Sequence, residues 1–339
     1  MVLVNEILSQ IVQVDRPMNW GTLATLKPYP NFIVDQDVEA LKKAIDAKGV
    51  DEATIVRILS NRSREQRVLI TKAFNKHSKM DLETSLKKKL SGYLENVILT
   101  LLKSPAQIGA QELKGSMKGL GTDEATLIEI LATRSNKELH EIDAAYKEEF
   151  QKDLEKDIVA DTSGRFQKLV LALAKGTRET NSNVINYELI EEDAMDLHRA
   201  ATQKKPPDFD AWIPILTERS QNHLNRVFKL YKVYSSCDIT ETIKKQMKGN
   251  DEKGFLALVQ SIQNTPEYLA DRLQSSMKGL GTRDQTLTRL LVSRCETDLL
   301  SIRAEFRKKY GKSLYSAIRD DTKGDYQCAL LGLCRAEDM

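Results

Sequence analysis

Four copies of one pattern occupy most of this chain, and this repetition restricts the fold more than any other feature. The segment Met117–Glu124 returns almost unchanged as Met277–Asp284. Aligning the chain on itself adds two weaker copies, with Gly49–Glu52 and Pro206–Asp208 at the equivalent points. Self-similarity of this depth is typical of proteins built from stacked structural repeats.

Positions in each copy are counted from four equivalent residues, Val50, Thr122, Pro207 and Thr282. Apolar residues at positions 5, 8 and 9, an arginine at 12, an aromatic residue at 24 and a leucine at 49 recur in all four copies. Because positions 5, 8, 9 and 12 share one helical face, we expect the apolar trio to be buried and each arginine to have a paired acceptor. The arginines are thus predicted to hold helices together rather than to bind ligands. The recurring residues are Ile55, Ile58, Leu59, Arg62, Phe74 and Leu99; Leu127, Ile130, Leu131, Arg134, Tyr146 and Leu171; Trp212, Ile215, Leu216, Arg219, Tyr231 and Leu256; and Leu287, Leu290, Leu291, Arg294, Phe306 and Leu331.

The helical pattern begins near residue 34 and predicts an all-α fold. The interval between successive copies varies and is longest from Thr122 to Pro207, while the spacing within a copy is constant. The extra length therefore lies between copies, mostly in the polar stretch 175–183, which we expect to be a linker between two halves. The predicted segments are a tail at 1–33, repeats at 34–104 and 105–175, a linker at 176–187, and repeats at 188–262 and 263–339.

Charge and cysteine content exclude several classes of protein. The 51 basic and 49 acidic residues leave a formal net charge of +2, so no global field favours nucleic acid as the main partner. The four cysteines have no metal-binding spacing, which indicates reduced thiols and a cytoplasmic protein. No run approaches the roughly 18 apolar residues of a membrane-spanning helix.

The N-terminal segment 1–14 has the pattern of a short amphipathic helix. Val4, Ile7, Leu8 and Ile11 form one apolar stripe, and a helix of this length needs a surface to dock on. The pattern leaves open whether that surface belongs to this chain or to a partner protein. Residues 15–33 contain three prolines and no helical period, so an extended connector is expected.

The loops that open copies two and four have the composition of a cation site. Glycines at alternate positions allow the backbone to expose carbonyl oxygens, which suit hard cations such as calcium. Calcium also needs a carboxylate, and position 39 supplies Asp161 in copy two and Asp321 in copy four. Thr122 and Thr282 are suitable N-caps for the helices that follow.

These features resemble the annexin family. The pattern K-G-x-G-T, followed at position 39 by an acid and set within four copies of one repeat, is specific to it, and the resemblance covers about residues 34–335. The tail and the form of Lys48–Glu52 are most similar to the annexin II and annexin I branch. The resemblance implies about five helices per repeat, a slightly curved disc, and calcium loops on a convex face that docks on acidic phospholipid.

The family's ligands can be transferred to matching positions of this sequence. Copy one departs from the main site because it has Ala47 and Lys89, and copy three because it has Pro206 and Gln246, so only weak sites are expected in copy one and none in copy three. Lysine and leucine at the tips of the two complete loops are expected to contact the membrane. The resemblance implies main sites at Met117, Gly119, Gly121 and Asp161 and at Met277, Gly279, Gly281 and Asp321, weak sites at Gly49, Val50 and Glu52 and at Leu90 and Glu95, and membrane contacts at Lys118, Leu120, Lys278 and Leu280.

The predicted function is calcium-dependent binding to acidic phospholipid such as phosphatidylserine, without catalysis and with membrane bridging or scaffolding. With little net charge, a calcium ion shared between loop and lipid phosphate provides the attraction locally. The protein would then be peripheral on the cytosolic face of membranes when calcium rises, and an extracellular surface pool is also compatible with the resemblance.

A second hypothesis is a protein-interaction scaffold. In similar annexins the N-terminal helix docks on an S100-type dimer to form a heterotetramer, and Val4, Ile7, Leu8 and Ile11 match its apolar positions. Ser9 stands where the family usually has cysteine. The sequence leaves contact with actin or RNA open.

An enzymatic reading has no support. Gly311-Lys312-Ser313 resembles the end of a phosphate loop, but Phe306 stands where that loop needs glycine.

Overall fold

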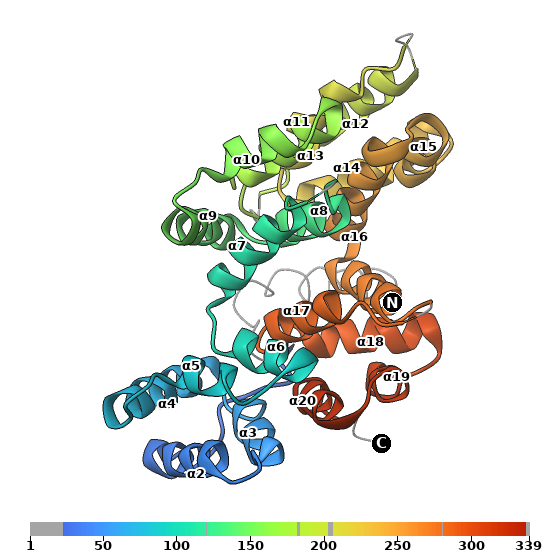
Figure 1. The fold of residues 1–339 in the computed structure, drawn as a ribbon. Helices are drawn as coiled ribbons and strands as arrows, with labels where there is room; N and C mark the ends of the chain where they lie inside the picture. The colour runs from blue at the N-terminus through green and yellow to red at the C-terminus, as the bar shows by residue number, and fades with distance from the viewer. Residues whose placement is uncertain (1–22, 120, 182–183, 203–205, 280, 337–339) are drawn as a thin grey trace. The chain divides into compact units, whose positions relative to one another are not determined.

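The computed structural model describes residues 23–119, 121–181, 184–202, 206–279 and 281–336. Within these ranges the regular structure is helical, with no strand, and four repeats of about five helices follow one another (Figure 1). The predicted all-α class and repeat architecture are confirmed. The predicted N-terminal helix, with Val4, Ile7, Leu8 and Ile11, lies outside the described residues.

The helices of the first two copies follow the same order. Copy one contains α2 (Val34–Asp46), α3 (Glu52–Leu59), α4 (Arg64–His77), α5 (Leu82–Lys87) and α6 (Gly92–Leu101). Copy two contains α7 (Pro105–Ser116), α8 (Glu124–Thr133), α9 (Asn136–Phe150), α10 (Leu154–Asp161) and α11 (Gly164–Ala174).

Copies three and four share one long element. Copy three contains α12 (Tyr187–Thr202), the 3₁₀ helix η2 (Phe209–Ala211), α13 (Trp212–Glu218), α14 (Gln221–Ser235), α15 (Ile239–Gln246) and the first part of α16 (Gly249–Ser276). Copy four contains the rest of α16, α17 (Asp284–Arg294), α18 (Leu299–Tyr310), α19 (Leu314–Asp321) and α20 (Gly324–Cys334).

The element α16 is two helices joined at a kink. Asn264 has the non-helical angles φ −157° and ψ 89°. Its side-chain oxygen accepts a hydrogen bond from the backbone N–H of Glu267 at 3.2 Å, as an N-cap does. Pro266 falls in the first turn of the second helix, where a proline is tolerated.

The chain forms two compact units, and each contains two copies. Residues 23–104 and 269–336 form unit one, which joins copies one and four, whereas residues 105–268 form unit two, which joins copies two and three. In unit one, α6 packs on α17 and α20, and α20 also packs on α3 (Figure 1). The segment 176–187 lies inside unit two, so the expectation that it divides the chain into halves is wrong. The pairing of copies depends on contacts between residues distant in sequence, which the repeat pattern does not encode.

The predicted core residues occupy the interior of both units. Of the twelve residues at positions 5, 8 and 9, eleven are buried and Ile215 is half-buried. All four aromatic residues at position 24 are buried. In unit two the core also contains Trp212, fully buried, whose indole Nε1 donates to the carbonyl of Leu197 at 3.0 Å. Burial of these large side chains supplies most of the stabilisation of each unit.

The arginines at position 12 have the expected acceptors, although the acceptors differ. Arg62 forms a two-pronged pair with Asp37 at 2.6 and 2.8 Å, and both side chains are nearly buried. Arg219 pairs with Asp193 on α12, and Arg294 pairs with Asp298. Arg134 instead donates to the hydroxyl of Thr133 at 2.9 Å. The prediction that these arginines tie helices together is confirmed for the three carboxylate pairs.

The extended connector is a structural part of unit one. The backbone N–H of Leu26 donates to the carbonyl of Cys295 at 3.0 Å, and the hydroxyl of Thr25 donates to the carbonyl of Leu333 at 2.6 Å. The ring of Tyr29 stacks 3.8 Å from the guanidinium carbon of Arg62. The connector therefore bonds to copy four at one point and covers an arginine of copy one at the next.

Breaking the Arg62–Asp37 pair should destabilise unit one strongly. Arg62→Met leaves the Asp37 carboxylate buried without its partner, and we expect it to cost about 3 kcal/mol of unfolding free energy. Removing both charges in Arg62→Met/Asp37→Leu should restore most of that loss. Urea denaturation measures both, and a single variant as stable as wild type would contradict the assignment.

Candidate calcium-binding loops

The loop between α7 and α8 is closed by one backbone hydrogen bond. The N–H of Asp123 donates to the carbonyl of Ser116 at 2.8 Å, and the N–H of Arg283 donates to the carbonyl of Ser276 at 2.7 Å in copy four. Equivalent bonds from Asp51 and Asp208 close the other two loops. The closure is thus shared by all four copies and does not depend on the glycines.

The alternating glycines of copies two and four adopt backbone angles that other residues avoid. Gly119 and Gly121 have φ of 111° and 96°, and Gly279 and Gly281 have 117° and 97°. No heavy atom lies within 4 Å of the place where a Cβ would be at any of the four, so these glycines face open space. The requirement is conformational rather than steric: an L side chain would be strained here.

Each loop is joined to the acid at position 39 by a threonine. The hydroxyl of Thr122 donates to Oδ2 of Asp161 at 2.6 Å and lies 2.9 Å from its carbonyl oxygen. In copy four the hydroxyl of Thr282 donates to Oδ2 of Asp321 at 2.7 Å. The structure thus brings together the loop and the acid that are separated in the sequence by the helices of the copy.

The expected role of the two threonines as N-caps is wrong. Helix α8 is capped by Asp123, whose carboxylate accepts from the N–H of Thr126 at 3.0 Å, and the N-cap of α17 is Arg283, which forms no side-chain cap. A carboxylate is a stronger acceptor for a hydroxyl than a neutral group. Because α8 and α17 begin two residues after the threonines, the N-cap position falls on Asp123 and Arg283, and each threonine hydroxyl donates to the acid at position 39.

The donor set fits calcium better than a softer metal. The described residues contain no group of three or more His, Cys, Asp and Glu side chains that could hold a metal ion. The loops of copies two and four contain backbone carbonyls and are each bonded to one acid, Asp161 or Asp321, and carbonyl and carboxylate oxygens are ligands that calcium prefers. Met117 and Met277, which were also expected to contribute carbonyls, are the first residues of the two loops. Both side chains are half-buried.

The expected membrane-contact lysines, Lys118 and Lys278, are exposed beside these loops. The expected contacts Leu120 and Leu280 lie outside the described residues.

Copy one differs at both halves of the site. Gly49 does not take a positive φ, and position 39 holds the exposed Lys89. Glu52, expected as a ligand of a weak site, lies against Asp325 of copy four. Burial and the neighbouring Asp325 carboxyl raise the pKa of Glu52. The ligand assignments at Gly49 and Val50 remain predictions.

The second weak site expected in copy one involves Leu90, which is buried, and Glu95, which lies in the first turn of α6. It also remains a prediction. In copy three Gln246 ends α15 and is exposed, as the equivalent acids end α10 and α19.

In unit one, contacts between the paired copies bring their loops to one end. Position 2 of copy one (Glu52) meets position 43 of copy four (Asp325). The rings of Tyr93 and Tyr326 lie 5.5 Å apart, and the Tyr326 hydroxyl lies 3.5 Å from the carbonyl of Asp284. These residues stand at the first turns of α3, α6, α17 and α20, so all four loops of unit one share an end.

Unit two has the same arrangement with different side chains. The amide of Asn250 donates to Glu124 at 2.7 Å. Arg165 pairs with Asp210 at 2.8 Å and with Asp251 at 2.9 Å. These contacts were not predictable from the sequence because position 43 holds a different residue in each copy. The residue at position 43 of one copy contacts the residue at position 2, 3 or 44 of its partner copy, and this rule can be applied only once the partner copy is known.

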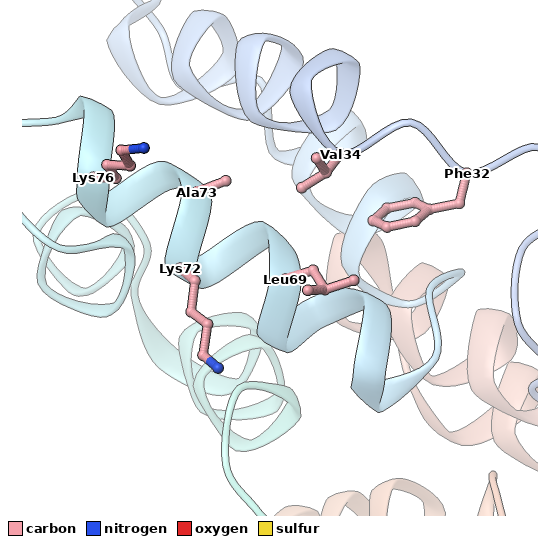
Figure 2. Close-up of a pocket in the computed structure, with 6 residues that line it drawn as sticks. All are labelled: Phe32, Val34, Leu69, Lys72, Ala73 and Lys76. Atoms are coloured by element: carbon pink, nitrogen blue, oxygen red, sulfur yellow. The ribbon is translucent and has the colours of Figure 1, made fainter.

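A hollow of about 380 Å³ in unit one is separate from these loops. Figure 2 shows its lining, which comes from the connector, the start of α2 and the middle of α4. Its lining includes Lys72 and Lys76 but no acid. Helix α2 has 13 residues, so its start lies about 20 Å from the loop at its other end. The hollow is therefore not part of the candidate site.

A search of the described helices finds none that is both long and apolar enough to cross a membrane.

Comparison with known proteins settles the family. The annexin family model matches four segments, residues 36–101, 109–173, 192–258 and 268–333. The chain belongs to the annexin family. It is 46% identical to human annexin A9 over 337 residues, which covers 99% of this chain and 97% of that protein. It is 48% identical to horse annexin A1 over 314 residues, covering 93% and 90%, which agrees with the expected likeness to the annexin I branch.

Among solved structures, annexin III superposes with a TM-score of 0.90 at 42% identity, covering 93% of this chain and 98% of that one. Calcium-dependent phospholipid binding is the property of this family, whose members are generally not enzymes, and a calcium-bound crystal structure is among its solved members.

The Glu52–Asp325 contact should make the stability of unit one depend on pH. Because the folded-state pKa of Glu52 is raised, the native protein holds its proton more tightly than the unfolded chain, and stability falls as pH rises through that raised pKa. Glu52→Gln should therefore raise Tm at pH 7.5, by about 1 °C because the group is largely solvated. The gain should vanish below pH 4.5, the ordinary pKa of this carboxyl, where Glu52 is protonated in both the native and the unfolded state.

Calorimetry in the presence of a chelator measures this effect without calcium. Glu124→Gln, at the same position of unit two, is the matched control and should give no gain, because Glu124 already has an amide partner in Asn250. An equal gain in both variants would rule out the carboxyl pair as the cause.

Proposed function

We propose that this annexin binds membranes containing acidic phospholipid when calcium occupies the loops of copies two and four. The observation that carries the proposal is the hydrogen bond from each loop threonine to the acid at position 39. This bond supports the proposal because it ties one carboxylate to a loop whose glycines face open space, and one carboxylate together with loop carbonyls would be the ligand set of a modest calcium site. No catalytic step is part of the proposal.

The ligands in copy two are the carbonyls of Met117, Gly119 and Gly121 with the carboxylate of Asp161. Those in copy four are the carbonyls of Met277, Gly279 and Gly281 with Asp321. With one protein carboxylate per site, calcium affinity without lipid should be weak, on the order of 10⁻⁵ to 10⁻³ M. Lipid phosphate adds ligands, so calcium and membrane strengthen each other's binding by the same factor.

Contact with the membrane involves the residues around each ion. Lys118 and Lys278 are exposed beside the glycines and can meet acidic headgroups. Leu120 and Leu280 between the glycines can touch the interface. Attachment is then peripheral and reversible, on the cytosolic face when calcium rises, and two membranes can be bridged if a second attachment point is available.

The test is co-sedimentation with vesicles of phosphatidylserine and phosphatidylcholine, with calcium and with a chelator. Asp161→Ala/Asp321→Ala should lose at least about ten-fold in vesicle affinity at a calcium level that saturates wild type, since the only carboxylate of each main site is removed. Isothermal titration without lipid should show the same loss of calcium binding.

The matched control is Asp35→Ala/Asp143→Ala, which removes one exposed acid from each unit away from the loops. It should bind as wild type does. Vesicle binding that ignores calcium, or a double loop variant that binds normally, would sink the proposal.

A second function, as a scaffold for another protein, is favoured by the apolar stripe of Val4, Ile7, Leu8 and Ile11. An S100-type dimer is the partner that this stripe fits, and two copies of this chain on one dimer would form a heterotetramer. Deletion of residues 1–14 should abolish capture of such a dimer and leave vesicle binding intact. Capture that survives the deletion would exclude this segment as the docking element.

A further inference from the structure

The turn between the fourth and fifth helices has the same backbone in all four copies. The N–H at position 40 donates to the carbonyl at position 36, at 2.8 Å in copies one and three and 3.0 Å in copies two and four. A glycine follows at position 42 with φ of 62°, 65°, 62° and 65°. The residues around position 39 are therefore presented in the same way in every copy.

The side chains at this turn differ by charge. Copy two has Asp161 as the one charged residue between positions 37 and 41, and copy four has two acids, Asp320 and Asp321, among two basic residues. Copies one and three have no acid there and three lysines each. These are Lys87, Lys88 and Lys89 in copy one, and Lys244, Lys245 and Lys248 in copy three.

The lysines of both copies lie on the surface, and the ammonium group of Lys88 contacts Sδ of Met80 at 3.4 Å. All six are exposed. Lys245 forms an i,i+4 ion pair with Glu241 at 3.5 Å, and no ion pair within the described part of the chain engages the other five. Lysines at the C-terminal end of a helix stabilise it, because their positive charge lies near the unpaired carbonyl groups of the last turn. That effect explains a lysine at the end of α5 or α15, but it does not require three.

Each unit contains one copy whose turn has an acid at position 39 and one copy whose turn has three lysines. Unit one has the acid turn of copy four and the lysine turn of copy one, and unit two has the acid turn of copy two and the lysine turn of copy three. The contact of Tyr93 with Tyr326 puts the two turns of unit one at the same end. The Arg165–Asp251 pair does the same in unit two. When the candidate calcium loop of a unit meets a membrane, the lysine turn of the same unit therefore meets it too.

We propose that Lys87, Lys88 and Lys89 in unit one, and Lys244, Lys245 and Lys248 in unit two, form calcium-independent contacts with acidic lipid headgroups. The idea rests on the proposed membrane binding and adds a second kind of contact to it. Copies two and four bind lipid phosphate through calcium, while copies one and three bind it directly through ammonium groups. Calcium then sets whether the protein attaches, and the lysine turns set how strongly it prefers acidic membranes.

Removing these charges should weaken binding by a measurable factor. A lysine near an acidic bilayer strengthens attachment about five-fold, so Lys87→Gln/Lys88→Gln/Lys89→Gln should lose at least about ten-fold even if only some of the three reach the surface. The loss should be smaller at high salt, about 300 mM, than at about 50 mM, because exposed charges are screened. The equivalent triple variant of unit two, at Lys244, Lys245 and Lys248, should behave alike.

The matched control removes three exposed lysines from the other end of unit one. Lys72 and Lys76 line the hollow in Figure 2, near the start of α2. Lys27 follows Leu26, which is bonded to Cys295 at the end of α17, away from the loop at its start. Lys27→Gln/Lys72→Gln/Lys76→Gln changes the net charge equally and should bind within two-fold of wild type.

The measurement is co-sedimentation at saturating calcium with two kinds of vesicle, phosphatidylcholine containing a minor fraction of phosphatidylserine and phosphatidylcholine alone. Lys→Arg at the same three sites should restore binding to the acidic vesicles. Isothermal titration of calcium without lipid should be the same for the lysine variants and wild type, whereas the loop variants at Asp161 and Asp321 lose it.

The two proposals fail in different ways. If the lysine triples bind as tightly as the control triple while the loop variants lose binding, the lysine contact is wrong and the calcium mechanism stands. If the loop variants retain calcium-dependent binding, the calcium mechanism is wrong, whatever the lysine triples do. Unchanged Tm in every lysine variant establishes that the fold is intact.

Discussion

Burial of one apolar face between two copies is the constraint on which the rest of this structure depends. A five-helix copy has too little interior to cover its own trio at positions 5, 8 and 9, so copies associate in pairs. In unit one this packs α3 and α6 of the first copy against α17 and α20 of the last. The same packing brings the first turns of these helices together, which is why the loops of both copies share an end.

The helices were predictable because their determinants are local and repeated four times. Positions 5, 8, 9 and 24 identified the core, and position 12 identified four arginines of which three pair with carboxylates. The pairing of copy one with copy four was not predictable, since it joins residues from opposite ends of the chain, as in the bond between Arg67 and Glu296. Nothing in a periodic sequence states which copies will meet.

The candidate site likewise has some features that were predictable from the sequence and others that were not. The constant spacing put Asp161 and Asp321 in register with the glycine loops, and the family resemblance implied that they lie beside them, as the bonds from Thr122 and Thr282 show. The role of Thr122 was misjudged because α8 begins one residue later than expected, with Asp123 as its N-cap, and only the folded chain shows that Asp161 lies within reach of the threonine hydroxyl. Glu52 was expected to face a cation, but it meets the carboxyl of Asp325, which comes from another copy. Its environment could not be derived from the repeat to which it belongs.

The turn with a positive-φ glycine at position 42 has a consequence for how such chains can change over time. The turn has the same backbone whether position 39 holds aspartate, lysine or glutamine. The backbone conformation therefore does not depend on the residue that determines whether the turn can supply a carboxylate. A single codon change can therefore remove or create the acid of a candidate ion site while the backbone of the turn stays the same. Each copy can change its residue at position 39 separately from the others. The number of turns that supply an acid can then differ between related proteins that share the same fold.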